Sequence, residues 1–462
     1  MSSDSELREK LTRAGQEHVL RYWDELSESE RHSLQRQLED VDLPLIQELA
    51  AQLLEPDDGE TPKLEPAPVV QERGLDAQRL AAAKERGEAA LREGRVAAFV
   101  VAGGQGTRLG YPGPKGCFEI TPVHGKSLFQ WHAEKIAATS QRYGKTVPWI
   151  VMTSQANDEE TREFFERNRY FGLASDDVHF ICQAMMPAVG HDGKLLLADR
   201  GELFWSPNGH GGSLLALRAS GTLDQLKERG VEEIFYFQVD NPLLRMLDPL
   251  FIGLHIEEQA EMSSKVVPKR SPDEKVGVVG LKGGRFGVIE YSDLTTEQME
   301  ERDERGELRY NAGNIAIHMI RRDFVERLTH GGAFELPYHK AHKKIPHVNE
   351  AGQRVEPTEP NGYKFETFVF DALGYAKHSV TLEVPRELEF APVKNAEGDD
   401  SPETSKEALT TLFKSWVEAS GLDVDVQKAA AVEIAPSVAL DQDHFKDRVQ
   451  KGEVTEKDVS IA

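Results

Sequence analysis

Residues 96–110 read VAAFVVAGGQGTRLG, and this stretch decides the fold. The apolar run from Val96 to Ala102 is typical of a strand buried on both faces of a parallel sheet. Gly103, Gly104 and Gly106 follow directly, at the end of the strand where open α/β sheets bind ligands. Backbone N–H groups at such glycines can approach an anion that a Cβ would push away. The stretch therefore predicts an anion-binding turn.

Two basic residues belong to the same turn. Arg108 offers a planar fork for phosphate oxygens, and Lys115 offers a movable point charge. The turn lacks the Gly-Lys-Ser/Thr ending of the ATPase phosphate loop, and Leu109 stands where the dinucleotide fingerprint needs Gly or Ala. A purely geometric strand–turn–helix would not need either cation. We therefore expect a triphosphate site of another kind.

Strand and helix patterns alternate on both sides of this turn. Amphipathic helical spacing covers residues 6–54 and 75–93, separated by a linker at residues 55–68 that is rich in Pro, Glu and Asp. Further strands are expected at 149–153, 178–181, 234–239, 276–281 and 286–291, and helices at 128–139, 159–168 and 214–220. The alternation predicts an α/β fold with a mostly parallel sheet, and Gly283-Gly284 predicts a hairpin attached to it.

Length and charge limit the possible functions. A chain of 462 residues is expected to form two or three domains. We place a helical N-terminal region at 1–94, a catalytic domain at 95–390 and a small C-terminal domain at 391–462. The 55 basic and 79 acidic residues give a net charge of −24, which argues against nucleic acids and anionic membranes as partners.

The cysteine count and the hydropathy pattern indicate the compartment. Only two cysteines occur, Cys117 and Cys182, and neither lies in a metal-binding spacing. This pattern favours a reducing compartment. The N-terminus does not resemble a signal peptide, and no apolar run reaches the roughly 18 residues that a membrane span needs. We therefore expect a cytoplasmic protein.

One carboxylate invites a metal interpretation. Asp240 follows the apolar strand expected at 234–239, where a hard divalent cation that also binds phosphates could take it as a ligand. Asp240-Asn241-Pro242 is equally suited to an ordinary turn. The histidines of residues 339–344, HKAHKK, have no carboxylate nearby in sequence, and we interpret that stretch as a basic, solvated segment.

The glycine-rich turn, with Pro114-Lys115, resembles the signature of the eukaryotic-type UDP-sugar pyrophosphorylases. The similarity extends from Gly15-Gln16-Glu17-His18 to residues 392–396, PVKNA, which is most of the chain. The resemblance implies a central nucleotidyltransferase domain that is Rossmann-like and GT-A-like. It also implies transfer of uridylyl from UTP to a hexose 1-phosphate, with Mg²⁺ as cofactor. Within the family the chain is most similar to the branch that uses N-acetylglucosamine 1-phosphate.

The resemblance also assigns roles to individual residues. Arg108, Lys115 and Lys394 would act on the phosphates, and Asp240 would bind Mg²⁺. Nucleotide contacts would come from Ala102, Gly103, Gly104, Gln183, Gly209 and His210. Sugar contacts would come from Asp240, Asn241, Gly277, Glu290, Asn314, Phe368 and Phe370. The two phenylalanines would share one face if their segment is extended.

One position departs from the pattern of the N-acetylglucosamine branch. That branch usually carries Asn where His210 stands, whereas UDP-glucose and broad-specificity enzymes carry Gly-His-Gly there. Glucose 1-phosphate, or a broad range of sugar 1-phosphates, therefore remains the alternative substrate. The expected partners are small molecules alone, and the expected state is a monomer or a weak homo-oligomer.

Overall fold

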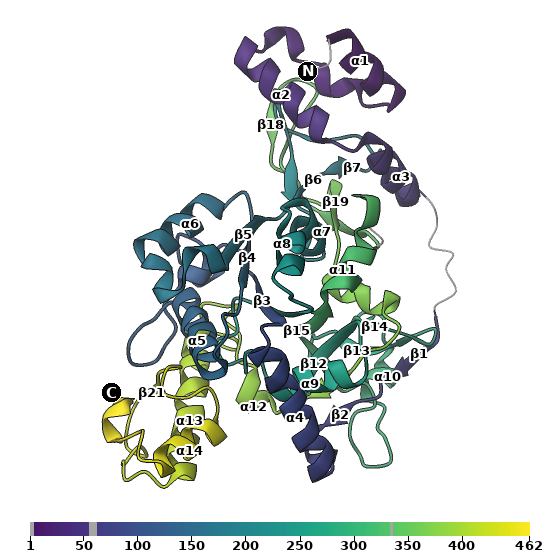
Figure 1. Cartoon of the computed structure of the whole chain (residues 1–462). Helices are drawn as coiled ribbons and strands as arrows, with labels where there is room; N and C mark the ends of the chain where they lie inside the picture. Colours follow the sequence, from purple (N-terminus) through teal and green to yellow (C-terminus); the bar gives the residue numbers. More distant parts are fainter. Residues whose placement is uncertain (1–3, 55–61, 333–335) are drawn as a thin grey trace. The chain divides into compact units, whose positions relative to one another are not determined.

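The computed structural model describes residues 4–54, 62–332 and 336–462, which divide into two compact units (Figure 1). Unit 1 comprises Met1–Thr61, Gln183–Gly212 and Leu336–Val369. Unit 2 comprises Pro62–Cys182, Ser213–Glu335 and Phe370–Ala462. These units are not the three segments expected from the sequence, and the three-domain division stays a prediction.

Unit 2 is built on an 11-stranded sheet with the order β2-β20-β12-β15-β11-β3-β4-β5, to which β1, β13 and β14 are attached. Strands β11, β3, β4 and β5 run parallel, and β15 pairs antiparallel with β11 and β12. The expected α/β fold with a mostly parallel central sheet is confirmed. The strands are β1 (Leu64–Pro66), β2 (Val70–Gln71), β3 (Val96–Val101), β4 (Trp149–Thr153), β5 (Val178–Cys182), β11 (Glu233–Gln238), β12 (Met262–Pro268), β13 (Val278–Lys282), β14 (Arg285–Ile289), β15 (Ala312–Arg321) and β20 (Thr381–Glu383).

The central position of β3 follows from its composition. All six of its residues are buried, as are all five of β4. Strands buried on both faces are stable only where helices cover both sides of a sheet. Each of these strands, together with β5 and β11, begins and ends within one residue of the expected bounds.

Helices flank this sheet, and polar caps define where several begin (Figure 1). Asp76, Ser127 and Asp248 each accept a hydrogen bond from the first turn of the following helix. The helices of unit 2 are α4 (Ala77–Arg92), α5 (Leu128–Tyr143), α6 (Asp158–Arg167), α7 (Gly212–Ala219, whose first residue belongs to unit 1), α8 (Thr222–Glu228), α9 (Pro249–Glu257), α10 (Thr296–Glu300), α11 (Arg322–Leu328), α12 (Arg386–Glu389), α13 (Pro402–Ser420) and α14 (Gln442–Gln450).

Two glycines allow α4 and α9 to pack backbone to backbone. A Cβ on Gly253 would lie 1.7 Å from the carbonyl oxygen of Ala83, and one on Gly87 would lie 1.9 Å from that of Pro249. We expect Gly253→Ala to lower the free energy of unfolding by about 1–3 kcal/mol, because the two helices must separate. Chemical denaturation measures this effect. The matched control, Gln78→Ala on the exposed face of α4, should change it by no more than about 0.5 kcal/mol, and equal effects would contradict the packing argument.

The hairpin expected around Gly283-Gly284 is confirmed. Strands β13 and β14 pair antiparallel, and both glycines have positive φ, at 59° and 80°. The linker expected at residues 55–68 is partly wrong, because Leu64–Pro66 forms β1 and pairs antiparallel with β13. The open edge of the hairpin supplies hydrogen bonds to this segment whatever its composition. Residues 55–61 of that linker lie outside the described residues.

Unit 1 joins the N-terminal helices to two later segments. Helices α1 (Asp4–Arg13), α2 (Glu28–Asp40) and α3 (Leu43–Leu54) share a core with Val189, Leu203 and Phe365. Gln16 donates to the carbonyl oxygen of Gly193 (3.0 Å) and accepts from the N–H of Leu195 (2.8 Å). The strands of unit 1 are β6 (Met185–Pro187), β7 (Val189–Gly190), β8 (Leu197–Asp199), β9 (Glu202–Leu203), β10 (Trp205–Pro207), β16 (His339–Lys343), β17 (His347–Val348), β18 (Arg354–Val355) and β19 (Gly362–Glu366).

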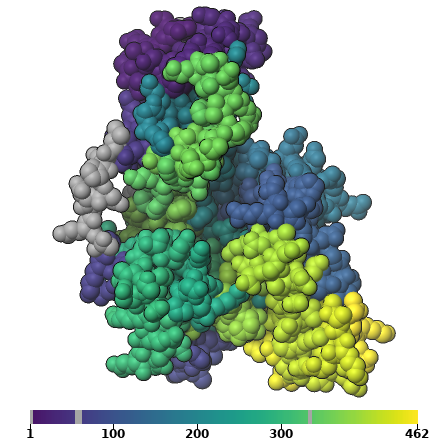
Figure 2. Space-filling model, turned by 180° about the vertical axis from the view of Figure 1, so that it is seen from behind, coloured from purple at the N-terminus to yellow at the C-terminus, as the bar shows by residue number. Residues whose placement is uncertain are grey.

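The C-terminal segment of unit 2 has its own small core. Helices α13 and α14 pack through Phe413, Trp416 and Phe445, beside strands β21 (Val432–Ile434) and β22 (Val459–Ile461). Figure 2 shows these C-terminal residues, in yellow-green to yellow, gathered in one continuous area of surface. Among the described residues, no helix combines the length and the apolar character that crossing a membrane would require.

Candidate functional site

Two side chains hold the turn after β3 by hydrogen bonds to its backbone carbonyl groups. Asn157 donates through its amide nitrogen to the carbonyl oxygens of Ala102 (2.9 Å) and Gly104 (3.3 Å). Ser154 donates to the carbonyl oxygen of Gly103 (2.8 Å). Both side chains are buried and follow β4, the parallel neighbour of β3. The turn is therefore fixed in one orientation by the adjacent strand end.

The glycines of the turn have different roles. A Cβ on Gly106 would lie 2.9 Å from Tyr111, and the Gly106 N–H donates to the carbonyl oxygen of Gly113 (2.8 Å), so this glycine closes the turn. In contrast, a Cβ on Gly104 would meet no atom within 4 Å. The turn is therefore packed at one end and open at Gly104, where a ligand could approach the backbone.

The two cations of the turn differ in their surroundings. Arg108 is exposed and has no carboxylate partner in the described part of the chain. Lys115 is half-buried, and its Nζ lies 3.1 Å from Oδ2 of Asp240; each side chain is 17% exposed. Strand β11, which leads to Asp240, runs parallel to β3, and Gln238 is paired with Val101. The register of two neighbouring strands thus brings the lysine and the carboxylate together.

Asp240 could hold Mg²⁺ only if substrate phosphates and water supplied most of the other ligands. Among the described residues, no group of three or more His, Cys, Asp or Glu side chains could hold a metal by itself. Mg²⁺ is commonly held by one or two carboxylates while substrate phosphates and water supply the other oxygens. A single half-buried carboxylate beside a lysine is consistent with that arrangement. The magnesium assignment stays a prediction.

The segment that carries Lys394 is attached to the same strand end. The N–H of Val393 donates to the carbonyl oxygen of Asp240 (2.8 Å). Asn241 is buried, and its amide bonds the carbonyl oxygen of Glu389 (2.7 Å) and the N–H of Ala391 (3.2 Å). Asn241 therefore holds backbone in this structure, and its expected sugar contact remains a prediction. Lys394 itself is 47% exposed, with its Nζ 3.8 Å from Asp400.

Three of the expected sugar-binding residues lie together in unit 2. The N–H of Asn314 donates to the carbonyl oxygen of Gly277 (2.8 Å). A Cβ on Gly277 would lie 2.6 Å from Cγ1 of Val288 and 3.2 Å from the carboxylate of Glu290, so a larger residue would crowd both side chains. Asn314 also accepts from the N–H of Ala316, which has a positive φ of 54°. A carboxylate, an amide and a glycine backbone thus form one polar cluster.

Unit 1 brings together four more of the expected site residues, namely Gln183, Gly209, His210 and Phe368. Gln183 is buried and donates to the carbonyl oxygen of Gly209 (2.5 Å), whose φ is +81°. His210 lies against Phe368, with ring centroids 5.3 Å apart, and its Nδ1 accepts from the N–H of Val369 (3.1 Å). Phe368 in turn stacks on His339, the first residue of the basic segment. Gln183 and His210 are thus ordered by contacts within their own unit.

The pair Phe368 and Phe370 departs from expectation. Residues Val369–Tyr375 form a 3₁₀ helix, so the segment is not extended and the two rings do not share a strand face. Phe368 belongs to unit 1 and Phe370 to unit 2. Val369, between the two phenylalanines, is fully buried at the start of this helix.

Burial determines the state of one thiol beside the turn. Cys117 follows Lys115 by two positions and is buried. This burial raises the pKa of its thiol to about 12. A thiol rather than a thiolate is present at neutral pH, and thiols react slowly with oxidants. Cys117 is therefore a packing residue.

The chain is similar to known proteins along most of its length. The family model described as UTP–glucose-1-phosphate uridylyltransferase matches residues 47–457. The chain belongs to the UTP–glucose-1-phosphate uridylyltransferase family. The human UDP-N-acetylhexosamine pyrophosphorylase-like protein 1 is 38% identical over 91% of this chain and 87% of that protein. UDP-N-acetylglucosamine diphosphorylase 2 of Arabidopsis thaliana is 37% identical over 90% of this chain and 85% of that protein.

A solved structure agrees with these relatives. The uridine diphosphate N-acetylglucosamine pyrophosphorylase of Trypanosoma brucei aligns with a TM-score of 0.82 and 31% identity, over 98% of this chain and 95% of that one. The alignment includes both compact units. The family resemblance of the glycine-rich turn is thus confirmed across almost the whole chain.

Sequence reasoning missed two residues of this uridylyltransferase-family site. Ser154 and Asn157 hold the glycine turn, yet neither stands in a motif of its own. Their only signal is their position, because they directly follow the strand expected at 149–153. Polar residues after one parallel strand can be expected to contact the turn after its neighbour.

Proposed function

We propose that this chain is a nucleotidyltransferase that joins UTP and N-acetylglucosamine 1-phosphate to give UDP-N-acetylglucosamine and pyrophosphate. The observation that carries the proposal is the Lys115–Asp240 pair beside an open glycine turn at the ends of two parallel strands. The acceptor sugar is supported by the relatives, which are named for N-acetylglucosamine or N-acetylhexosamine. Glucose 1-phosphate remains the second candidate because His210 matches the UDP-glucose pattern.

The reaction is an in-line displacement at the α-phosphorus of UTP. A phosphate oxygen of the sugar 1-phosphate forms the new P–O bond, and the bond to the β-phosphate oxygen breaks with its electron pair, releasing pyrophosphate. The nucleophile is already anionic, so no general base is required. The protein's task is to position two anions and stabilise the charge that develops between them.

The residues divide this task according to their positions. The open backbone at Gly104 can approach the phosphates, while Lys115 and the exposed Arg108 offset their negative charge. Lys394, on the segment attached to Asp240, would bring in the sugar phosphate. Mg²⁺ at Asp240 would supply further stabilisation of phosphate charge when bound. The roles of Gln183, His210 and Phe368 remain predictions from the resemblance.

A paired assay tests the acceptor sugar. Pyrophosphate release from UTP is measured side by side with N-acetylglucosamine 1-phosphate and with glucose 1-phosphate. We expect kcat/KM to be at least about tenfold higher with the N-acetylated sugar, because one group that fills a pocket contributes about 1–3 kcal/mol. A preference for glucose 1-phosphate, or equal rates, would favour the second candidate.

Two further expectations are also proposals. We propose a cytoplasmic location, and a monomer or weak homo-oligomer in solution. Light scattering after size-exclusion chromatography measures the second directly. A mass near the 51.6 kDa of one chain at micromolar concentration is the expected result.

A further inference from the structure

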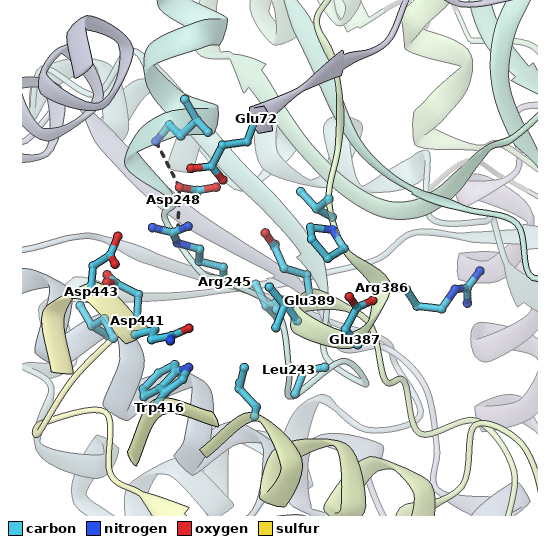
Figure 3. Close-up of a pocket in the computed structure, with 18 of the residues that line it drawn as sticks. Glu72, Leu243, Arg245, Asp248, Arg386, Glu387, Glu389, Trp416, Asp441 and Asp443 are labelled. Carbon is cyan, nitrogen blue, oxygen red and sulfur yellow. Dashed lines mark hydrogen bonds and ion pairs between the residues drawn. The ribbon is translucent and has the colours of Figure 1, made fainter. Parts of the chain in front are cut away.

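Unit 2 contains a pocket of about 780 Å³ that no step of the proposed reaction uses (Figure 3). One wall is apolar and comes mainly from the C-terminal helices and the loop after β11. It includes Leu243, Leu409, Leu412, Phe413, Trp416 and Ile434. The pocket is large enough to hold an aromatic ring, which could pack against this apolar wall.

The opposite wall is a network of buried charges. Lys265 is fully buried, and its Nζ lies 2.6 Å from Glu389 and 2.9 Å from Asp248. Both carboxylates line the pocket. Lys265 thus offsets one of these two carboxylate charges, and Arg245, the second cationic neighbour of Asp248, offsets the other.

Arg245 is the group in this network whose hydrogen bonds are least satisfied. Its Nε lies 3.6 Å from Oδ1 of Asp248, which is an ion-pair distance and too long for a hydrogen bond (Figure 3). Within the residues that the structure describes, its guanidinium makes no hydrogen bond, and the side chain is 28% exposed. Five donors in a fixed fork beside an apolar wall match a carboxylate, which accepts two of them at once.

The acidic residues around the pocket limit the charge of its ligand. Asp441 pairs with Arg142 (3.0 Å), while Asp443 and Glu387 are exposed at the lining. Six basic and seven acidic side chains line the pocket, so their charges nearly cancel. A polyphosphate would add several negative charges to this balance, whereas a single carboxylate adds one and can use the donors of Arg245 that form no hydrogen bond within the described chain. The chemistry therefore selects a monoanion with an apolar body.

The pocket lining is continuous with the segments that hold the reaction site. Lys135 and Trp131 line it and donate to the carbonyl oxygen of Pro242, at 2.7 and 3.0 Å, two residues after Asp240. On the other side, the backbone of Glu389 accepts from Asn241. A ligand that moved either segment would move Asp240.

We propose that this pocket is an effector site for small aromatic monocarboxylates, and that its occupation changes turnover at the Lys115–Asp240 pair. The effect on turnover rests on the proposed function, because turnover is what is measured. Binding of the carboxylate to the pocket does not depend on the proposed function.

Titration calorimetry on the full chain tests binding with 4-phenylbutyrate and its uncharged amide. We expect saturable binding of the acid, and binding of the amide about tenfold weaker, since a charge-assisted bond to Arg245 is lost. Arg245→Met should remove this difference, and Leu412→Arg should abolish binding by filling the pocket. Ala419→Arg, at an exposed position of the same helix outside the lining, is the matched control and should bind normally.

Two further measurements complete the test. The Lys115→Ala protein should bind the acid unchanged, which separates this pocket from the reaction site. In the unmodified protein, saturating acid should change kcat or KM for pyrophosphate release at least twofold, and this change should vanish in Leu412→Arg.

The inference is overturned by absent binding, by binding that neither pocket variant alters, or by binding that leaves kcat and KM unchanged. Inactivity of the unmodified protein on both sugar phosphates would instead refute the proposed function, and the coupling with it. In that case calorimetry alone still decides the binding site.

Discussion

Replacing Lys115 with alanine is expected to lower kcat for pyrophosphate release about 10³-fold, which is the scale for removing one preorganised charge from a transferring phosphoryl group. Lys115 is the half-buried cation of the glycine turn, and its Nζ is already placed 3.1 Å from Asp240. A group fixed before substrate arrives needs little reorganisation in the transition state. Stopped assays at saturating UTP and sugar 1-phosphate measure the effect on kcat.

A second lysine–carboxylate pair in unit 2 provides the control for this variant. Lys126 lies 2.7 Å from Glu134, with side-chain exposures of 15% and 24%, close to those of the Lys115–Asp240 pair. Lys126→Ala removes this pair and a longer contact to the buried Glu433 (3.8 Å), neither of which any part of the proposed reaction uses, so kcat should change less than about fivefold. Comparable losses in both variants, or near-normal turnover in Lys115→Ala, would refute the assigned role.

The sequence predicted those parts of the fold that depend on local pattern. The apolar run of β3, its glycine turn and the Gly283-Gly284 hairpin each carry their signal within a few residues. Strand β1 does not, because Leu64–Pro66 becomes a strand only through its pairing with β13, more than two hundred residues later. Long-range pairing of this kind leaves no mark on composition.

The candidate site shows the same division. Arg108, Lys115 and Asp240 could be named from their positions after strands, and the register between β3 and β11 then brings Lys115 to Asp240. The position of Ser154 and Asn157 after the strand expected at 149–153 was their only signal, and which carbonyl groups they contact depends on the register between β3 and β4. The sugar contact of Phe370 stays a prediction, but its segment is not extended, because a run of apolar residues suits a 3₁₀ helix with a buried Val369 as well as a strand.

Asp240→Asn is expected to lower kcat/KM about 10²- to 10³-fold and to raise the Mg²⁺ concentration that gives half-maximal rate. The amide keeps the shape of the side chain but removes the charge that would hold a hard cation. It also leaves Lys115 without the carboxylate at 3.1 Å, so the lysine is free to settle elsewhere. Rates measured across a magnesium titration distinguish weaker metal binding from displacement of Lys115.

A double-mutant cycle shows how much of the Asp240→Asn effect on kcat/KM comes from the loss of the Lys115–Asp240 ion pair. If Asp240 acted only by holding Lys115, the Lys115→Ala/Asp240→Asn protein would be no slower than Lys115→Ala alone. We expect it to be slower by at least about tenfold, because under the proposed mechanism Asp240 would also hold the cation that stabilises phosphate charge. Glu134→Gln should leave the magnesium dependence unchanged. An Asp240→Asn protein with an unaltered magnesium requirement would exclude Asp240 as a metal ligand and leave it the narrower role of positioning Lys115.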